Sequence, residues 1–260
     1  MDGRDIGLHA AMAAPSTEQA ALQALCLSER RAPRNTCILR PNDTGARLRT
    51  LQTGWAVRCR MFSDGRRQII GILLPGDTFG IETLFDDTLD HLVWSTSAVT
   101  YSVLDGDAAI KLFDSAHWFR RRLMRTLSEE KAASERWMSQ LGRCDAEERT
   151  ASLLLMLHER LSVLGLATRR HFRLELTQQD LADMLGLHLI HLNRILSRLR
   201  ARKLIQMQGQ EITLSDLDGL AELVPVSSHA MQPARSDAAG RNGRQEPAAS
   251  RISSNTGTMA

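Results

Sequence analysis

The 260-residue sequence contains only four cysteines, and no two of them form a Cys-x-x-Cys pair. This spacing excludes a disulfide framework and fits a reducing compartment. No apolar run approaches the ~20 residues that cross a bilayer, and Asp2 and Asp5 stand where a signal peptide has basic residues. We therefore expect a cytoplasmic protein that does not interact with a membrane.

A strong excess of charge of one sign is also absent. The chain has 33 Lys and Arg against 30 Asp and Glu, a net charge of +3. Such a small excess does not by itself attract polyanions, so any nucleic-acid site has to come from local clustering of charge. The length and the 43% apolar content indicate two domains with additional segments.

Residues 36–104 consist of short apolar runs separated by turn residues, which is typical of hairpins in a β-sandwich or roll. The Asp-Gly pair at residues 64–65 marks the clearest turn, because such a pair tolerates positive φ angles. Residues 94–104 predict the last strand, in which alternate apolar side chains share one face. These side chains are Val99, Tyr101 and Val103.

The two ends differ from this pattern. Residues 1–20 lack periodicity and predict a flexible arm that leads into a short helix, Ser16 to about Leu27. Residues 225–260 have no aromatic residue and are rich in Ser, Ala, Gly and Arg, so we expect a disordered tail.

Residues 118–141 contain no glycine or proline and predict one long helix. Selected positions recur every seven residues and form a narrow, partly polar stripe. Such a stripe favours pairing with the same helix of a second subunit, and packing along the chain's own β-domain is the alternative. The candidate dimer-interface residues are Leu123, Leu127, Ser134, Trp137 and Leu141.

Residues 177–200, TQQDLADMLGLHLIHLNRILSRLR, predict two short helices separated by Gly186. Thr177 is the expected amino-terminal cap, with Asp180 as the third helical residue. The small Ala182 permits a close crossing of the two helices, so the spacing is that of a helix-turn-helix. The second helix, residues 188–200, is predicted to bury Leu189, Leu192, Ile195, Leu196 and Leu199.

The second helix carries arginines on its outer face, and no acidic residue occurs between Asp183 and Glu211. This local positive charge predicts that the helix enters a DNA groove, with Arg194 reading a guanine edge. His188 and His191 have no Cys, Asp or Glu nearby in that interval, so we expect no metal site. The DNA-binding candidates are Thr177, Gln178, His188, Ile190, His191, Asn193, Arg194 and Arg198.

Downstream, LIQMQGQEITL at residues 204–214 predicts a two-stranded wing with Gly209 in its turn. Upstream, Asp145 and Glu148 predict a capped helix that ends at Gly165. Residues 37–224 resemble the Crp/Fnr family of bacterial transcription regulators. The resemblance depends on four features in this order: GWAVRCRMFSDGRRQIIGILLPGDTFG, LGRCDAEERTASLLLMLHERL, the helix-turn-helix and the wing.

The resemblance implies an α+β protein that regulates transcription without being an enzyme. Its partners would be double-stranded DNA carrying a two-fold symmetric operator, a second copy of the chain, and RNA polymerase. Together with the two ends, this predicts a flexible arm (1–20), a cyclic-nucleotide-binding-like double-stranded β-roll as sensor (21–113), a dimerisation helix (114–143), a winged helix-turn-helix (144–224) and a disordered tail (225–260).

The sequence departs from the family pattern at several sites. Many members have Glu-x-x-Ser-Arg in the recognition helix, where this chain has Ile190, Asn193 and Arg194. Members that bind cyclic AMP hold its phosphate with an Arg-Ser pair, and the matching positions here carry His91 and Leu92. Because neither side chain neutralises a phosphate as a guanidinium does, we expect no cyclic AMP binding.

Cofactors are likewise not expected. Members with an iron–sulfur cluster have several closely spaced cysteines near the amino terminus, whereas Cys26 and Cys37 have no third neighbour. We expect no cluster, and the effector, if any, is unknown, with Glu82 and His91 as its candidates. His91 or Cys59 are the conceivable haem ligands.

Two alternative functions remain open. One is a cyclic-nucleotide or haem sensor that acts mainly through protein contacts. The other is a cupin-like metal enzyme, but that chemistry requires two closely spaced histidines and a carboxylate, and the roll offers only His91.

Overall fold

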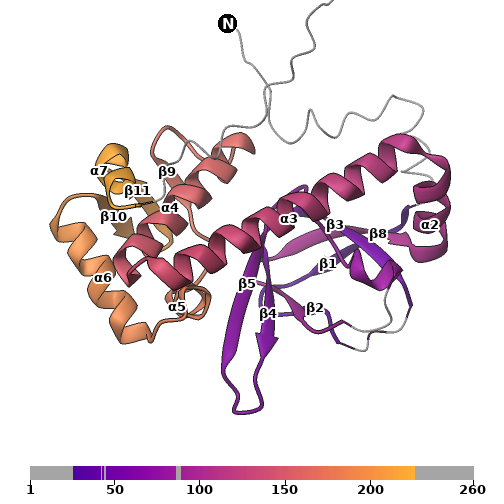
Figure 1. The fold of residues 1–260 in the computed structure, drawn as a ribbon, viewed down its shortest axis with the longest axis horizontal. Helices are drawn as coiled ribbons and strands as arrows, with labels where there is room; N and C mark the ends of the chain where they lie inside the picture. The colour runs from indigo at the N-terminus through magenta and orange to yellow at the C-terminus, as the bar shows by residue number, and fades with distance from the viewer. Residues whose placement is uncertain (1–25, 42, 44, 86–88, 226–260) are drawn as a thin grey trace, which may run out of the picture. The chain divides into compact units, whose positions relative to one another are not determined.

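The computed structural model describes residues 26–41, 43, 45–85 and 89–225 (Figure 1). The predicted flexible arm and all but the first residue of the predicted tail lie outside these ranges. The described part begins with a strand-rich region. Its elements are β1 (Cys26–Ala32), β2 (Cys37–Leu39), β3 (Arg47–Thr53), β4 (Ala56–Met61), β5 (Arg67–Leu73), β6 (Thr78–Phe79), the 3₁₀ helix η2 (Glu82–Leu84), β7 (Leu92–Ser95) and β8 (Val99–Asp105).

These strands form two antiparallel four-stranded sheets, in the orders β1-β8-β3-β6 and β2-β7-β4-β5. Apolar side chains from both sheets meet in a shared core, as expected for a β-roll. The predicted alternation along β8 is confirmed, because Val99, Tyr101 and Val103 are all buried. The other members of this core are Ala32, Ile38, Leu39, Leu51, Ala56, Leu73, Phe79, Leu89 and Val93.

The start of the β-region was predicted too late. Strand β1 begins at Cys26 and pairs antiparallel with β8, where Ala32 lies opposite Val99. The predicted helix over Ser16 to Leu27 is therefore wrong at its last two residues, and the rest of it lies outside the described residues. Pairing with a strand far along the chain determined the conformation here, and local periodicity did not reveal it.

The predicted single strand over residues 94–104 is two strands. A bend at residues 96–98 separates β7 from β8, and the carbonyl oxygen of Trp55 accepts a hydrogen bond from the Thr96 amide at 2.9 Å. Strand β7 belongs to one sheet and β8 to the other. The bend is where the chain crosses between the two sheets, which an alternating pattern does not indicate.

The hairpin at residues 64–65 is confirmed and joins β4 to β5. Of the two turn residues only Gly65 has a positive φ, at +84°. Two backbone hydrogen bonds close the turn. The Phe62 amide donates to the carbonyl oxygen of Arg66, and the Gly65 amide donates to the carbonyl oxygen of Phe62. The glycine is required at one position, because other residues rarely adopt such a φ.

Two helices follow the roll: α2 (Gly106–Ser115) and the predicted long helix, α3 (His117–Arg143). One face of α3 packs on its own chain. Leu123 is 1% exposed in a cluster with β-roll residues, Trp137 packs against a second cluster, and Glu130 forms an ion pair with Arg58 of β4. Leu123 is thus covered within its own chain, which corrects its assignment to a dimer interface.

A stripe beside this face of α3 is largely open. It follows a heptad spacing of alternating three and four residues and includes large exposed apolar side chains. Leu127 is the one partly buried member of the stripe. The stripe consists of Met124, Leu127, Lys131, Ser134, Met138 and Leu141.

The last part of the described chain is the predicted winged helix-turn-helix. The two-stranded wing is confirmed and Gly209 has a positive φ of +60° in its turn. A third short strand, β9, pairs with the wing and was missed by the sequence analysis because it is only three residues long. The elements are α4 (Ala146–Val163), β9 (His171–Arg173), α5 (Gln178–Leu185), α6 (Leu189–Ala201), β10 (Ile205–Gln208), β11 (Glu211–Leu214) and α7 (Leu217–Glu222).

Two further predictions about this part hold. Asp145 caps α4. Its carboxylate accepts a hydrogen bond from the Glu148 amide, and the Glu148 carboxylate accepts one from the Asp145 amide. Gly165, with φ of +69°, follows the end of this helix. Within residues 26–225 as described, no helix combines the length and apolar character needed to cross a membrane.

Candidate DNA-binding site

Helix α5 has the predicted cap and the predicted stop. The Thr177 hydroxyl accepts a hydrogen bond from the Asp180 amide at 3.0 Å, and the Asp180 carboxylate accepts one from the Thr177 amide at 2.8 Å. Gly186 ends the helix in the left-handed conformation, with φ of +66°. The capping box and the glycine fix the length of α5 and the direction in which the chain enters α6.

Helix α6 packs its apolar side onto α5 and α4. Four of the five side chains predicted to be buried there are buried, and Ala182 of α5 is completely covered. Leu189 is the exception, with 36% exposure. It is the first residue of α6, where the neighbouring helices do not cover it. The four buried residues are Leu192, Ile195, Leu196 and Leu199.

The outer face of α6 forms a shallow, wide-open groove that combines polar, charged and apolar side chains. Arg194 is exposed and Asn193 is half-buried beside it. Ser197 also lines the groove and was not among the predicted residues, although it lies one helical turn after Asn193 and Arg194. The full lining is Ile190, His191, Asn193, Arg194, Ser197 and Arg198.

The positive charge near α6 is partly balanced by an acid that is distant in sequence. Glu147 of α4 forms ion pairs with Arg198 at 3.4 Å and with Arg202 at 2.8 Å. None of the ion pairs formed among the described residues includes Arg194. The prediction of an acid-free arginine face is therefore corrected for Arg198 and Arg202. Arg194 lines the groove without an ion pair in the described part of the chain, so its guanidinium is the one best placed for a ligand.

The remaining predicted DNA-binding residues lie at helix starts. Thr177 and Gln178 are exposed at the amino terminus of α5, and His188 is the exposed cap residue of α6 without a side-chain capping bond. Backbone amides at helix starts favour phosphate oxygens. These residues have the exposure that contact with a DNA backbone requires.

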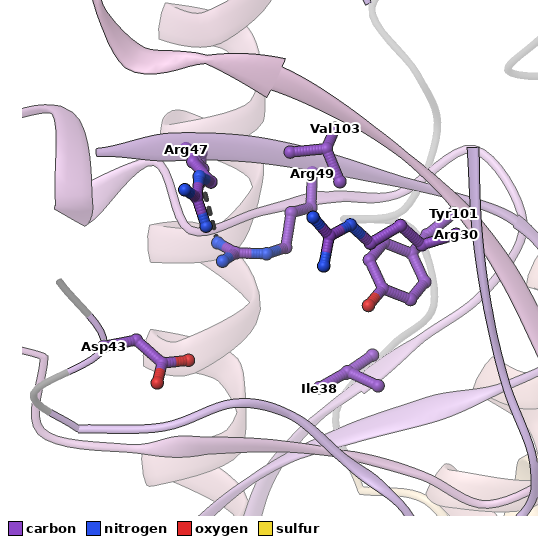
Figure 2. Close-up of a pocket in the computed structure, with 7 residues that line it drawn as sticks. All are labelled: Arg30, Ile38, Asp43, Arg47, Arg49, Tyr101 and Val103. Atoms are coloured by element: carbon purple, nitrogen blue, oxygen red, sulfur yellow. Dashed lines mark hydrogen bonds between the residues drawn. The ribbon is translucent and has the colours of Figure 1, made fainter. Parts of the chain in front are cut away.

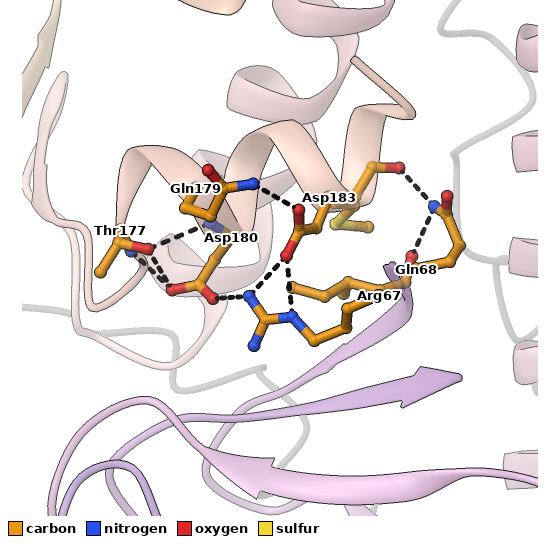
Figure 3. A network of polar contacts seen from close by, with 8 residues as sticks. Arg67, Gln68, Thr177, Gln179, Asp180 and Asp183 are labelled. Atoms are coloured by element: carbon orange, nitrogen blue, oxygen red, sulfur yellow. Dashed lines mark hydrogen bonds and ion pairs between the residues drawn. The ribbon is translucent and has the colours of Figure 1, made fainter. Parts of the chain in front are cut away.

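Strand β5 of the roll holds α5 through contacts that the sequence analysis did not find (Figure 3). Arg67 donates from Nε to Asp183 at 2.7 Å and from Nη2 to Asp180 at 2.6 Å. Gln68 donates to the carbonyl oxygen of Met184 at 3.1 Å. Burial lowers the pKa of Arg67, but its bonds to the two carboxylates outweigh burial and raise the pKa overall.

The candidate effector and haem residues of the roll do not form an obvious site. His91 is buried, with Nδ1 at 3.3 Å from a carboxylate oxygen of Asp90, and Glu82 begins the 3₁₀ helix η2. Burial raises the pKa of the Cys59 thiol to about 11, which keeps it protonated at neutral pH. No three His, Cys, Asp or Glu side chains cluster as metal ligands in the part of the chain that the structure describes.

Two family models match the chain. The cyclic nucleotide-binding domain matches residues 29–116, which is the β-roll and α2. The Crp-like helix-turn-helix domain matches residues 148–223, which includes α5, α6 and the wing.

Several transcription regulators are similar to this chain along most of its length. The transcriptional activator protein FnrL of Cereibacter sphaeroides is 30% identical over 174 residues, covering 65% of this chain and 69% of that protein. The anaerobic regulatory protein of Haemophilus influenzae is 28% identical over 199 residues, covering 75% and 76%. The structure of FixK2 from Bradyrhizobium japonicum superposes with a TM-score of 0.71 at 26% identity, covering 77% of this chain and 98% of FixK2.

The order of the domains, the helix-turn-helix and these relatives agree with one another. The chain belongs to the Crp/Fnr family and is a DNA-binding regulator of transcription.

Proposed function

We propose that the protein binds a two-fold symmetric operator as a homodimer, with α6 of each subunit in the major groove. The observation that carries this proposal is the open outer face of α6, where Arg194 is exposed and not engaged in an ion pair with the described residues. A guanidinium in this position can bond in bidentate fashion to guanine O6 and N7, for ~1–3 kcal/mol of discrimination per base pair. Arg194 is the proposed base-reading residue.

The other residues of this face have supporting roles in the proposal. Asn193, His191 and Ser197 are within the same groove and offer hydrogen-bonding groups to base edges or phosphates. Thr177, Gln178 and His188 contact the DNA backbone at the starts of α5 and α6. Arg198 contributes charge near a phosphate, reduced by its pairing with Glu147.

The second subunit would pair along the open stripe of α3. Met138 and Leu141 are 62% and 43% exposed, although both are large apolar residues. A heptad stripe of this kind is satisfied by a second copy in a parallel coiled coil. Of the predicted interface residues, Ser134 and Leu141 are exposed on this stripe, whereas Leu127 and Trp137 pack partly against their own chain. Met124 and Met138 are added to the proposed interface.

The experiment that tests DNA recognition is selection of duplexes from a random pool, followed by binding measurements on the selected site. Arg194→Ala should lower the affinity for that site by about 10- to 100-fold and relax the preference at one base pair of each half-site. Arg66→Ala is the control, because Arg66 is an exposed arginine of the β4–β5 turn and does not line the groove. Equal, sequence-independent binding by wild type and Arg194→Ala would contradict the proposal.

We also propose that the protein works in the cytoplasm, contacts RNA polymerase when bound near a promoter, and uses neither cyclic AMP nor an iron–sulfur cluster. His91 and Leu92 offer no guanidinium to a cyclic phosphate, and the His91 ring already faces Asp90. Calorimetric titration with cyclic AMP should give no saturable heat, and purified protein handled without oxygen should contain no stoichiometric iron.

A further inference from the structure

A cavity of about 300 Å³ opens into the β-roll. Its inner wall is formed by Ile38 of β2, Arg49 of β3, and Tyr101 and Val103 of β8, all of which are buried. Three exposed residues surround its mouth. They are Arg30, Asp43 and Arg47.

Arg49 is unusual because a charged side chain reaches into a core that is otherwise apolar. It is 7% exposed, and its Nη1 donates to the carbonyl oxygen of Arg47 at 3.0 Å. The ion pairs found among the described residues do not include Arg49. A buried guanidinium without a bonded carboxylate loses hydration that one carbonyl oxygen does not replace. Burial accordingly lowers the pKa of Arg49.

The backbone leaves room for this guanidinium at Gly80. Gly80 has φ of +79°, and a Cβ placed there would lie 3.0 Å from the carbonyl oxygen of Arg47 and 3.2 Å from Nη1 of Arg49. A side chain at this position would therefore press against the guanidinium. Glycine at this position leaves free the space beside the Arg49 guanidinium.

The charges that line the cavity do not balance. Three guanidinium groups face one carboxylate. Like Arg49, Arg30 and Arg47 form no ion pair within the described residues, so their positive charges are not compensated there. Figure 2 shows the side chains of Arg30 and Arg49 extending into the same space, with Asp43 across it. A ligand with two negative charges would neutralise the excess, and Ile38, Tyr101 and Val103 would contact an apolar part of it.

We propose that this cavity binds a small organic dianion of the phosphomonoester class, with its phosphate held by Arg30, Arg47 and Arg49. Arginine matches phosphate geometry through paired N–H donors. A cyclic phosphodiester carries a single charge and would leave part of the lining uncompensated. His91, Leu92 and Glu82 do not line the cavity, so this site is separate from the positions weighed for a cyclic nucleotide.

The test uses the full chain with phenyl phosphate, inorganic phosphate and benzoate as ligands, measured by calorimetry in low-salt Tris chloride. Phenyl phosphate should bind at least about tenfold more tightly than inorganic phosphate, because only it fills the apolar wall, and more tightly than singly charged benzoate. Arg30→Gln/Arg47→Gln should weaken it at least about tenfold. These two exposed residues can be changed without opening the core.

The matched control is Arg31→Gln/Arg66→Gln. It removes the same charge from two exposed arginines that pair with Glu29 and Asp64 and do not line the cavity. This variant should bind phenyl phosphate like wild type. Arg49→Gln tests whether the inner wall of the cavity contributes to binding of phenyl phosphate. Circular dichroism establishes that this variant is folded.

The sequence contains a single tyrosine, Tyr101, which lies in the cavity wall. Replacing it with 3-fluorotyrosine gives one ¹⁹F resonance that reports on the cavity, and phenyl phosphate should shift that resonance saturably with the calorimetric affinity. The proposal is overturned if phenyl phosphate does not bind, if both double variants bind it equally, or if binding leaves the resonance unmoved. DNA binding plays no part in these readouts, so failure here leaves the operator proposal untouched.

Discussion

The Nε atom of Arg67 lies 2.7 Å from a carboxylate oxygen of Asp183, and this contact connects the β-roll to the first helix of the helix-turn-helix. The same guanidinium reaches Asp180, which also belongs to the capping box of α5. Because α5 braces the recognition helix, a bond from the roll to α5 affects how firmly α6 is held. The contact gives the sensor-like domain a direct connection to the DNA-binding domain.

Removing this contact should destabilise the protein. Arg67→Ala leaves two partly buried carboxylates, 9% and 13% exposed, without their charged partner. We expect the free energy of unfolding to fall by about 2–4 kcal/mol. Urea denaturation followed by circular dichroism measures this change.

The neighbouring arginine provides the control for that experiment. Arg66 is exposed, pairs with Asp64 in the same turn and lies 5.6 Å from the centre of the Phe62 ring, so its contacts are confined to the exposed hairpin. Arg66→Ala should change the free energy of unfolding by less than about 0.5 kcal/mol. Equal losses in the two variants would show that the contacts with α5 contribute nothing particular to stability.

The α3 stripe predicts that a carboxylate in place of Met138, its most exposed apolar side chain, prevents dimer formation. Met138→Glu places a carboxylate where two copies of α3 would bury their methionines, and like charges would face each other across the seam. Light scattering should report a dimer for wild type and a monomer for Met138→Glu at micromolar concentration. Met61→Glu is the control, because Met61 is similarly exposed but lies at the end of β4. A dimeric Met138→Glu protein would contradict the proposed seam.

Gly186 and Gly142 should respond in opposite directions to replacement by alanine. Gly186 has φ of +66°, so a Cβ there is strained, and Gly186→Ala should lower the free energy of unfolding by about 1 kcal/mol. Gly142 lies within the last turn of α3 without a positive φ, and a Cβ there would meet nothing within 4 Å. Gly142→Ala should raise stability by up to about 1 kcal/mol. Thermal unfolding of both variants decides this, and stabilisation by Gly186→Ala would disprove the turn geometry.

The buried Cys59 thiol should make stability depend on alkaline pH. Its pKa is raised from the ordinary value of 9.0 to about 11, chiefly by burial. Between these two values the unfolded chain loses the proton while the folded chain keeps it. The contribution to stability is therefore complete below pH 9 and is lost as the pH rises towards 11, by up to about 1.4 kcal/mol per pH unit.

Cys59→Ala isolates this effect. The difference in the free energy of unfolding between wild type and Cys59→Ala should be constant at lower pH and should shrink between pH 9 and 11, as measured by urea denaturation. A difference that stays constant through pH 11 would show that the folded thiol titrates normally.

Local patterns were enough for the helix-turn-helix. Thr177, Asp180 and Gly186 specify a cap and a stop within a few residues of one another, and the apolar positions of α6 follow helical spacing. The Gly65 turn and the alternating strand β8 were readable for the same reason, because their determinants are adjacent in sequence. These features predicted the β-region, the helix-turn-helix after it and the recognition helix, and the family resemblance implied the α+β class.

Tertiary structure decided the features whose partners are far apart in the chain. Strand β1 pairs with β8. Glu147 of α4 forms ion pairs with Arg198 and Arg202. Arg67 of β5 forms hydrogen bonds with Asp180 and Asp183. Seven-residue spacing placed Leu123 and Leu141 on the predicted stripe of α3, but only the fold showed that Leu123 is buried against its own roll while Leu141 is exposed. The physical reason is that periodicity specifies which residues share a face, while the packing of other elements specifies what that face meets.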